Sequence, residues 1–369
     1  MSDNFEFSIK ERTLEKMLAL KKEMGFDERG WDEWFNHILN SNLNQQTNEN
    51  ELEKIMRKVY YDKFYDNWVK NFALNLTNIW NELSARALDP TTNPMYKAEE
   101  QSAIVIGRGP SVKKRKHLEL LANSNYKGSI VCCDGMLINA LKAGVTPEKF
   151  PNYYAITIDA AEIIKKYYDD KIVDIHGSKI NGIFSTVAHP LTVERARQAG
   201  IRMHWLHALF DYNEGKKSFN QISGLMVRAK NHPHGLPGIQ TGGNVGAASW
   251  FVSWKILKCS TIALIGINHG WDEDDPWEVI TSHGNSLSTL EMDKESSAFK
   301  KLFPKIYNPE FKCNCISDPI FQYYRSALLE FISRSPSWVT TINATEGGSI
   351  FGERIKCITF EEFLKKHEN

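Results

Sequence analysis

The sequence has no excess of charge of either sign, because 45 Lys and Arg residues balance 45 Asp and Glu residues. A chain with zero formal charge has no global attraction to nucleic acid or anionic lipid, so any anion must be recognised locally. Long apolar runs are also missing: the longest, such as Ile262–Ile267, are far too short to cross a bilayer. The N-terminus lacks the apolar core of a signal peptide. We therefore expect a soluble, cytoplasmic protein with neither membrane nor nucleic-acid partners.

Cysteine is scarce, with six residues in 369. Cys132 and Cys133 lie inside an apolar run, which is typical of a protein from a reducing compartment. Cys313 and Cys315 form a C-x-C pair without a second pair at matching spacing, so the signal for zinc is weak and no metal ligand is assigned. With 42% hydrophobic and 24% charged residues, the chain is neither disordered nor fibrous.

The first 98 residues predict two segments that differ in pattern. Residues 1–45 read as a small strand-helix-helix module, which resembles a ribbon-helix-helix fold. This module carries six basic and nine acidic residues, a net charge of −3, so homo-oligomer formation or docking is favoured over DNA binding. A polar linker follows at 41–50, and residues 46–98 predict a helical linker or hairpin whose apolar stripe runs from 51 to 87.

Residues 99–369 predict a Rossmann-like α/β domain. Short, fully apolar runs alternate there with helical segments, which is typical of a parallel sheet with helices on both faces. The runs are Ala103–Ile106, Ile130–Cys133, Tyr154–Ile158, Gly182–Phe184 and Ile262–Ile265. Because such sheets bind ligands beyond the carboxyl ends of their strands, the loops that follow these runs are the candidate site.

A glycine turn follows the first of these runs. Gly107 and Gly109 would let the backbone approach a ligand, and Ser111 is expected to cap a helix whose free N–H groups attract phosphate. The basic run 113–116 would add positive charge. We expect a side chain at position 109 to crowd this loop alone and to leave the fold intact. A purely structural turn is the alternative, because Val112 breaks the G-x-G-x-x-G fingerprint.

A second small-residue turn, Thr241-Gly242-Gly243-Asn244, precedes an apolar helical stretch. Its backbone donors and the Thr241 hydroxyl could hold an anion at a helix N-terminus. Close packing of the helix is the alternative.

Polar side chains follow several of the apolar runs. Asp134, Asp159 and Asn268 each come directly after one, where they could orient a ribose, a metal or a substrate hydroxyl. Either aspartate could instead cap the next helix. The acidic loop 272–275 could bind a divalent cation, although charge runs are more often solvated.

Histidine is the natural general base near neutral pH. His283 lies in a polar loop downstream of the last apolar run and is the candidate catalytic residue. His232 and His234 form another candidate pair. An incidental loop histidine is the alternative in each case.

Together, these features are similar to the 6-hydroxymethylpterin diphosphokinase MptE-like family. The similarity rests on the turn Gly107-Arg108-Gly109-Pro110-Ser111, on Asp134, on Thr241-Gly242-Gly243 and on the strand end 264–268. That family includes the motility-associated (Maf) glycosyltransferases and is distantly related in fold to bacterial sialyltransferases that use CMP-sialic acid. The stretch 342–348 resembles the end of the Maf central domain, and the resemblance spans roughly residues 74–364.

The resemblance implies a nucleotide site and a set of residue roles. Asp134 is expected to meet the nucleotide, and His283 is the nearest match to the catalytic histidine of the sialyltransferases. Asn268 stands where relatives typically carry an acid. The residues expected to hold the nucleotide phosphate and sugar are Gly107, Arg108, Gly109, Ser111, Thr241, Gly242 and Gly243.

The function implied first is a glycosyltransferase that moves a nonulosonic (sialic-type) sugar from a nucleotide donor such as a CMP-sugar to a glycan or protein. The alternative is diphosphate transfer from ATP to a hydroxymethylpterin, with Mg²⁺ as cofactor. A third reading is a catalytically inactive nucleotide-binding scaffold, which Asn268 in place of an acid would favour.

Overall fold

The computed structural model describes residues 64–209, 219–229, 235–275, 300 and 303–367, together with residues 18, 21 and 22. The chain divides into two compact units, Met1–Met56 and Arg57–Asn369. Leu18, Lys21 and Lys22, the described residues of the first unit, are helical. The predicted strand-helix-helix module otherwise lies outside the described residues, and the rest of the structure concerns the second unit.

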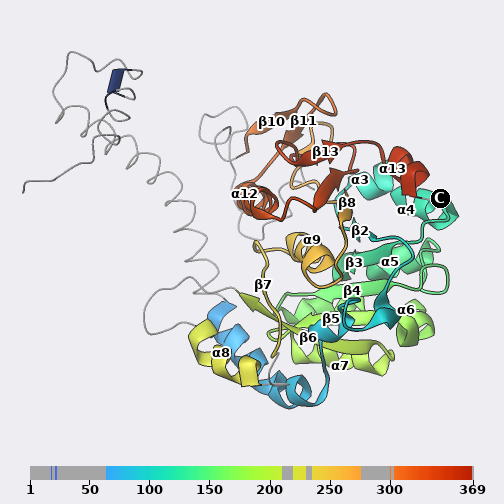
Figure 1. The fold of residues 1–369 in the computed structure, drawn as a ribbon, viewed down its shortest axis with the longest axis vertical. Coiled ribbons are helices and arrows are strands. Elements are labelled where there is room, and N and C mark those ends of the chain that lie inside the picture. Colours follow the sequence, from blue (N-terminus) through green and yellow to red (C-terminus); the bar gives the residue numbers. More distant parts are fainter. Residues whose placement is uncertain are drawn as a thin grey trace, which may run out of the picture. The chain divides into compact units, whose positions relative to one another are not determined.

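A ten-stranded, all-parallel sheet forms the centre of the second unit (Figure 1). Its strand order is β1-β6-β5-β4-β3-β2-β8-β12-β13, and β7 also pairs with β6. The strands are β1 Leu83–Ser84, β2 Ser102–Ile106, β3 Ser129–Cys133, β4 Tyr153–Thr157, β5 Asn181–Ser185, β6 Arg202–Leu209, β7 Gly238–Gln240, β8 Thr261–Ile265, β12 Thr340–Asn343 and β13 Ile355–Cys357.

The strand order reverses at β2. Strands β3 to β6 follow one another toward one edge of the sheet, whereas β8 lies on the other side of β2. In parallel α/β sheets such a reversal opens a crevice at the carboxyl ends of the strands. The topology therefore directs attention to the loops after β2, β3 and β8.

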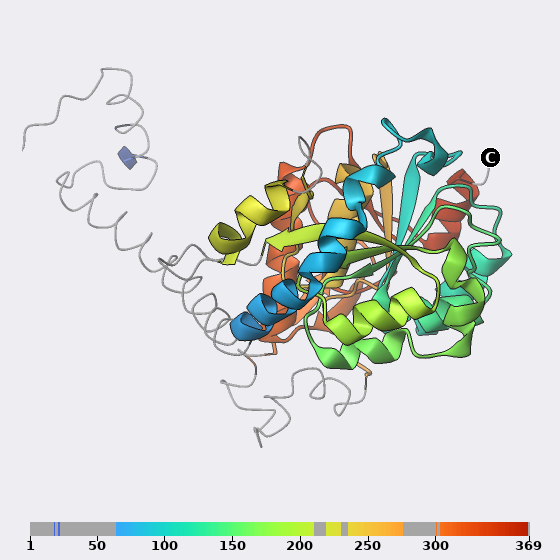
Figure 2. The same cartoon turned by 90° about the horizontal axis from the view of Figure 1, so that it is seen from below.

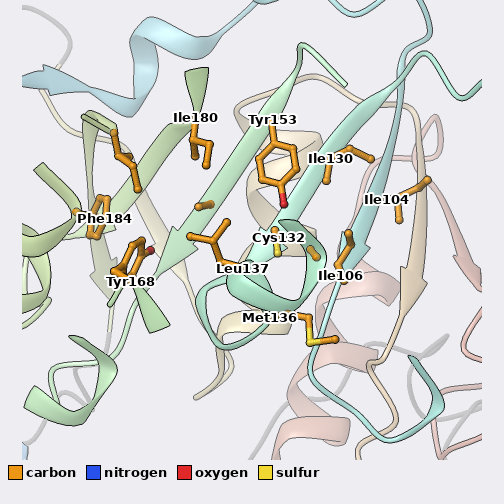
Figure 3. Close-up of a cluster of buried hydrophobic side chains, with 14 of the residues drawn as sticks. Ile104, Ile106, Ile130, Cys132, Met136, Leu137, Tyr153, Tyr168, Ile180 and Phe184 are labelled. Atoms are coloured by element: carbon orange, nitrogen blue, oxygen red, sulfur yellow. The ribbon is translucent and has the colours of Figure 1, made fainter. Parts of the chain in front are cut away.

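Helices cover both faces because successive strand residues alternate between two cores. Ile104 and Ile106 belong to one core, and Ala103 and Val105 belong to the other. Figure 3 shows the first core, where Ile104, Ile130 and Tyr153 project from neighbouring strands on the same face.

The first core contains residues of the helix over 64–81, drawn in blue in Figure 2, and of α4 His117–Asn123, α5 Leu137–Lys142, α6 Lys171–His176, α7 Pro190–Gln198 and α13 Phe360–His367. The second contains residues of η1 Ala85–Leu88, α9 Val245–Lys255 and α12 Pro319–Arg334. The first core also contains residues of α3 Ser111–Lys114, α8 Phe219–Ala229 and η3 Asp134–Met136, and Tyr167 of η4 Glu162–Tyr167 packs against it.

The Rossmann-like prediction is confirmed, with differences in detail. Each of the five predicted apolar runs matches a strand, namely β2, β3, β4, β5 and β8. The helix expected to extend to residue 87 ends at residue 81, because the chain turns there into β1, which pairs with β6. The strand β6 was not predicted.

A second, antiparallel sheet was also not predicted. It consists of β9 Trp271–Asp272, β10 Lys305–Asn308 and β11 Cys313–Ile316, in the order β10-β11-β9. The C-x-C pair lies on β11, where Cys315 is buried and pairs with Asp272.

Candidate functional site

The two glycines of the predicted phosphate turn pack directly against the end of β8. The Gly107 N–H donates to the Ile265 carbonyl at 2.8 Å, and the Gly109 N–H donates to the Gly266 carbonyl at 2.8 Å. A Cβ at Gly109 would lie 2.1 Å from Asn268 Oδ1 and 2.7 Å from the Gly266 carbonyl oxygen. These N–H groups are therefore already engaged, and a side chain at 109 would push against the strand end as well as the loop. The second finding corrects the expectation that a side chain at position 109 would crowd the loop alone.

The side chains of Ser111 and Asn268 connect the loop after β2 to the loop after β8. Pro110 is the N-cap of α3 and Ser111 is its first residue, so the predicted serine cap is wrong. The Ser111 hydroxyl instead donates to Asn268 Oδ1 at 2.9 Å, and Asn268 is 4% exposed. This buried bond locks the loop after β2 to the loop after β8.

The basic run and the acidic loop pair with each other. Lys114 Nζ lies 2.7 Å from an Asp272 oxygen, 2.8 Å from an Asp275 oxygen and 3.4 Å from an Asp274 oxygen. Burial disfavours the charged lysine, but the bonds to Asp272 and Asp275 outweigh it and raise the pKa of Lys114. The positive charge expected to serve a phosphate is thus compensated within the protein at this position, and the acidic loop is ion-paired rather than merely solvated.

The turn before α9 packs on α12. Gly242 and Gly243 have φ values of 58° and 79°, in the left-handed region that favours glycine. A Cβ at Gly243 would lie 2.7 Å from the Tyr324 ring, and the Thr241 hydroxyl oxygen accepts from the Gly243 N–H at 3.3 Å. The helix-packing alternative therefore has a direct structural basis.

The two glycine-containing turns nevertheless converge. A Cβ at Gly107 would lie 2.3 Å from Ile267 Cδ1, and a Cβ at Gly246, in the first turn of α9, would lie 2.6 Å from the same atom. Asn244 caps α9 by accepting from the Ala247 N–H at 2.9 Å. The loop after β2 and the start of α9 thus meet around one side chain.

A polar pocket lies on the other side of β2, over the carboxyl end of β3. It has a volume of about 170 Å³. The guanidinium of Arg108 lies 5.4 Å from the centre of the Tyr167 ring and also donates to the Tyr167 hydroxyl. A Cβ at Gly135 would lie 3.2 Å from Arg108 Cδ, so glycine leaves room for this side chain. The lining residues are Arg108, Asp134, Gly135, Ile138, Asn139 and Tyr167.

Asp134 supplies the buried acid of this pocket and is 5% exposed. Its Oδ2 accepts from the Thr157 hydroxyl at 2.9 Å, and its Oδ1 accepts from the Gly135 N–H at 2.6 Å. The Thr157 and Tyr168 hydroxyls are 2.8 Å apart. Burial raises the pKa of Asp134 to about 7, although both hydrogen bonds and Arg108 act to lower it. The group therefore changes protonation state near neutral pH.

The second predicted aspartate plays a different part. Asp159 Oδ1 accepts from the Ala161 N–H at 2.9 Å, which shapes the turn after β4. Its side chain reaches solvent, yet the surrounding protein still raises its pKa by desolvation. Asp159 does not line the pocket.

The histidine predictions receive no structural test. His283, His232 and His234 lie outside the described residues. His269 follows Asn268 and is 6% exposed, with its ring stacked on Phe321 at 5.9 Å between ring centres.

Sequence reasoning found Arg108 and Asp134 but missed the other polar members of the pocket. Tyr167 arrives on η4, more than thirty residues after Asp134, and no motif marks it. Asn139 was missed as well. Thr157 does not line the pocket but donates to Asp134, and it carried a signal as the polar last residue of the otherwise apolar strand β4.

Two features are absent from the described residues. No group of three or more His, Cys, Asp or Glu side chains in that part of the chain is placed to hold a metal ion. Within the same residues, no helix combines the length and apolar character that a bilayer span needs.

The parallel sheet defines a Rossmann-like protein, and a polar pocket lies at the carboxyl edge of this sheet, where such folds bind ligands. A family model described as 6-hydroxymethylpterin diphosphokinase MptE-like matches residues 70–274, more than half of the chain, so the chain belongs to the MptE-like family.

One solved structure is described as the Maf glycosyltransferase from Magnetospirillum magneticum AMB-1, and it is 14% identical with a TM-score of 0.48. The match covers 73% of this chain and 36% of that protein, so this chain spans only about a third of its length. No match was found among curated proteins.

Proposed function

We propose that the chain is a nucleotide-dependent transferase whose reaction takes place at the pocket between Arg108 and Asp134. The supporting observation is that a guanidinium and a buried carboxyl group face one pocket at the carboxyl ends of β2 and β3. Arginine binds phosphate oxygens through paired N–H donors, and the Tyr167 ring beside it offers a face on which a base or sugar can stack.

The Gly107 and Gly109 N–H groups donate to the end of β8, so we propose that this turn supports the site and does not bind the nucleotide through these two donors. Gly107, Gly109, Ser111 and Asn268 hold the loops after β2 and β8 together, which fixes the position from which Arg108 projects. Thr241, with Gly242 and Gly243 in its turn, is a second contact that we propose for the nucleotide.

The transferred group that we propose first is a nonulosonic sugar from a CMP-type donor, passed to a glycan or protein hydroxyl. This rests on the resemblance of residues 342–348 to the Maf central domain. The family description favours a second candidate, the transfer of diphosphate from ATP to a hydroxymethylpterin. In that case Mg²⁺ would bridge the nucleotide phosphates, as phosphoryl transfer usually requires.

A thermal-shift screen tests the proposal. A nucleotide that binds only the folded protein raises its melting temperature. The screen uses CMP, CDP, GDP, UDP, ADP and ATP, each with and without Mg²⁺. A shift with CMP that needs no Mg²⁺ supports sugar transfer, and a shift with ATP that needs Mg²⁺ supports diphosphate transfer. If no nucleotide shifts the melting temperature, the proposed function is wrong.

The variant Arg108→Met tests whether the nucleotide binds in this pocket. Loss of a hydrogen-bonded ion pair to a phosphate should weaken affinity by at least roughly tenfold, measured by calorimetry with the nucleotide that gives the largest shift. Lys166→Met is the matched control, because Lys166 also lies over the Tyr167 ring, at 5.2 Å, but does not line the pocket. Equal losses in both variants would show that general charge, not this pocket, attracts the nucleotide.

A further inference from the structure

Hydrogen bonds hold both carboxyl oxygens of Asp134. One carboxyl oxygen is fixed by a backbone N–H and the other by the Thr157 hydroxyl, which is itself next to the Tyr168 hydroxyl. Thr157 and Tyr168 are fully buried, so this chain of hydroxyl groups ends inside the protein. Of the three hydrogen-bonded groups, only the Asp134 carboxyl group lines the pocket.

We propose that Asp134 accepts the proton of the attacking hydroxyl during group transfer, so that it takes the role predicted for His283. The inference rests on the proposed function. It is carried by the geometry of one buried carboxyl group that shares a pocket with one guanidinium, at the carboxyl edge of the sheet.

The step balances without a co-reactant. The hydroxyl oxygen of the acceptor, or of water, forms a bond to the transferred group, and its proton passes to Asp134. The bond from that group to the nucleotide oxygen breaks, and the nucleotide leaves with the electron pair. Arg108 lies where it can neutralise the charge that develops on the leaving phosphate.

The surroundings of Asp134 determine when it can accept a proton. Burial favours its neutral form, the nearby Asp159 carboxylate adds to that effect, and Arg108 opposes it. The other titratable groups facing it are Tyr167 at the end of η4, Tyr168 directly after it, and the thiols of Cys132 and Cys133 in β3. With a pKa of about 7, the carboxyl group is ionised and able to accept a proton above neutral pH.

The test measures turnover between pH 5 and 9 with two donors. One assay follows CMP release from CMP-N-acetylneuraminate with water as acceptor, and the other follows AMP release from ATP with 6-hydroxymethyl-7,8-dihydropterin and Mg²⁺. With whichever donor is used, kcat should rise with pH through about 7. Asp134→Asn should keep the nucleotide-induced thermal shift but lower kcat by about 10²–10⁴-fold, the usual contribution of general acid-base catalysis.

Two variants that keep the carboxyl group distinguish proton transfer from a structural role. Thr157→Val removes a hydrogen bond to the charged form, so the rising limb of the pH profile should move to higher pH. Asp159→Asn removes a like charge beside Asp134, so the limb should move to lower pH. A residue that only supports the fold would not produce opposite shifts.

The outcomes separate the two proposals. Turnover by the wild type that Asp134→Asn leaves intact overturns the role of Asp134 and leaves the transferase standing. A pH limb that persists in Asp134→Asn and disappears in His283→Ala returns the role to His283. A wild type that binds nucleotide but turns over neither donor across the pH range contradicts both the proposed role and the proposed transfer.

Discussion

The two sides of β2 differ in how they use the carboxyl edge of the sheet. On the β8 side, where the strand order reverses, two loops close on each other through backbone hydrogen bonds, a buried Ser111–Asn268 bond and glycines without room for a Cβ. On the β3 side, a polar pocket opens between Arg108 and Asp134. The comparison teaches that the glycines of a Rossmann-like turn can serve loop packing, while the polar pocket opens beside the neighbouring strand.

The closed side gives the largest expected effect. In Gly109→Ala the new methyl group meets the Gly266 carbonyl and displaces the Asn268 side chain from Ser111. Overpacking together with a lost buried hydrogen bond should lower the free energy of unfolding by about 3 kcal/mol. Urea unfolding followed by tryptophan fluorescence measures it. Gly347→Ala is the control, because its Cβ would meet its nearest neighbour only at 3.8 Å.

If Gly109→Ala proved as stable as Gly347→Ala, the loops after β2 and β8 would not be locked together. The glycine would then be explained better by a bound phosphate than by packing.

The open side should show the opposite sign, because a buried carboxyl group opposes folding once it ionises. The pKa of Asp134 is raised from 3.8 to about 7 in the folded protein, so its contribution is favourable below pH 4 and is lost as pH rises from about 4 to 7. The pKa difference corresponds to about 4 kcal/mol at pH 8. Asp134→Asn cannot ionise, and after a cost of about 2 kcal/mol for the rearranged hydrogen bonds of the amide it should be more stable than the wild type by about 2 kcal/mol at pH 8, with no such gain at pH 4.

The asparagine amide can donate to the Thr157 hydroxyl oxygen in this variant, because Thr157 can then donate to Tyr168: either hydroxyl of that pair can be the donor. Melting temperatures of both proteins at pH 4, 6 and 8 provide the measurement. A variant that is less stable than the wild type at pH 8 would show that Asp134 supports the fold.

The sequence predicted the centre of the fold because its strands are fully apolar. All residues of β2 and β3 are buried, and both strands were identified within one residue of their ends. The strand β6 was not predicted because it contains His204 and His207, and histidine is often exposed to solvent. In the structure His204 Nδ1 lies 3.0 Å from the Arg202 carbonyl oxygen, and His207 Nδ1 lies 2.8 Å from the Thr186 hydroxyl oxygen.

Of the pocket residues, the sequence could predict only those in the turns that directly follow an apolar strand. Asp134 was found because it directly follows an apolar strand, and the location rule for parallel sheets applies to it. Tyr167 was missed because it comes from a 3-10 helix after β4 that has no motif. The engagement of the Gly107 and Gly109 N–H groups was missed because it depends on β8, which is more than 150 residues away in sequence.

The smallest expected effect concerns the ion pairs beside the closed loops, and it asks whether charge or packing holds that side together. Lys114 bridges Asp272 and Asp275, but its side chain is 36% exposed, so solvent screens these attractions. Lys114→Met should therefore lower the free energy of unfolding by about 0.5–1 kcal/mol at low salt, and the difference from wild type should shrink in 0.5 M NaCl. Lys113→Met, the neighbour in the same short helix, provides the matched control. A loss as large as that of Gly109→Ala would mean that the lysine and its three carboxylates, rather than the glycine packing, close the β8 side of the sheet.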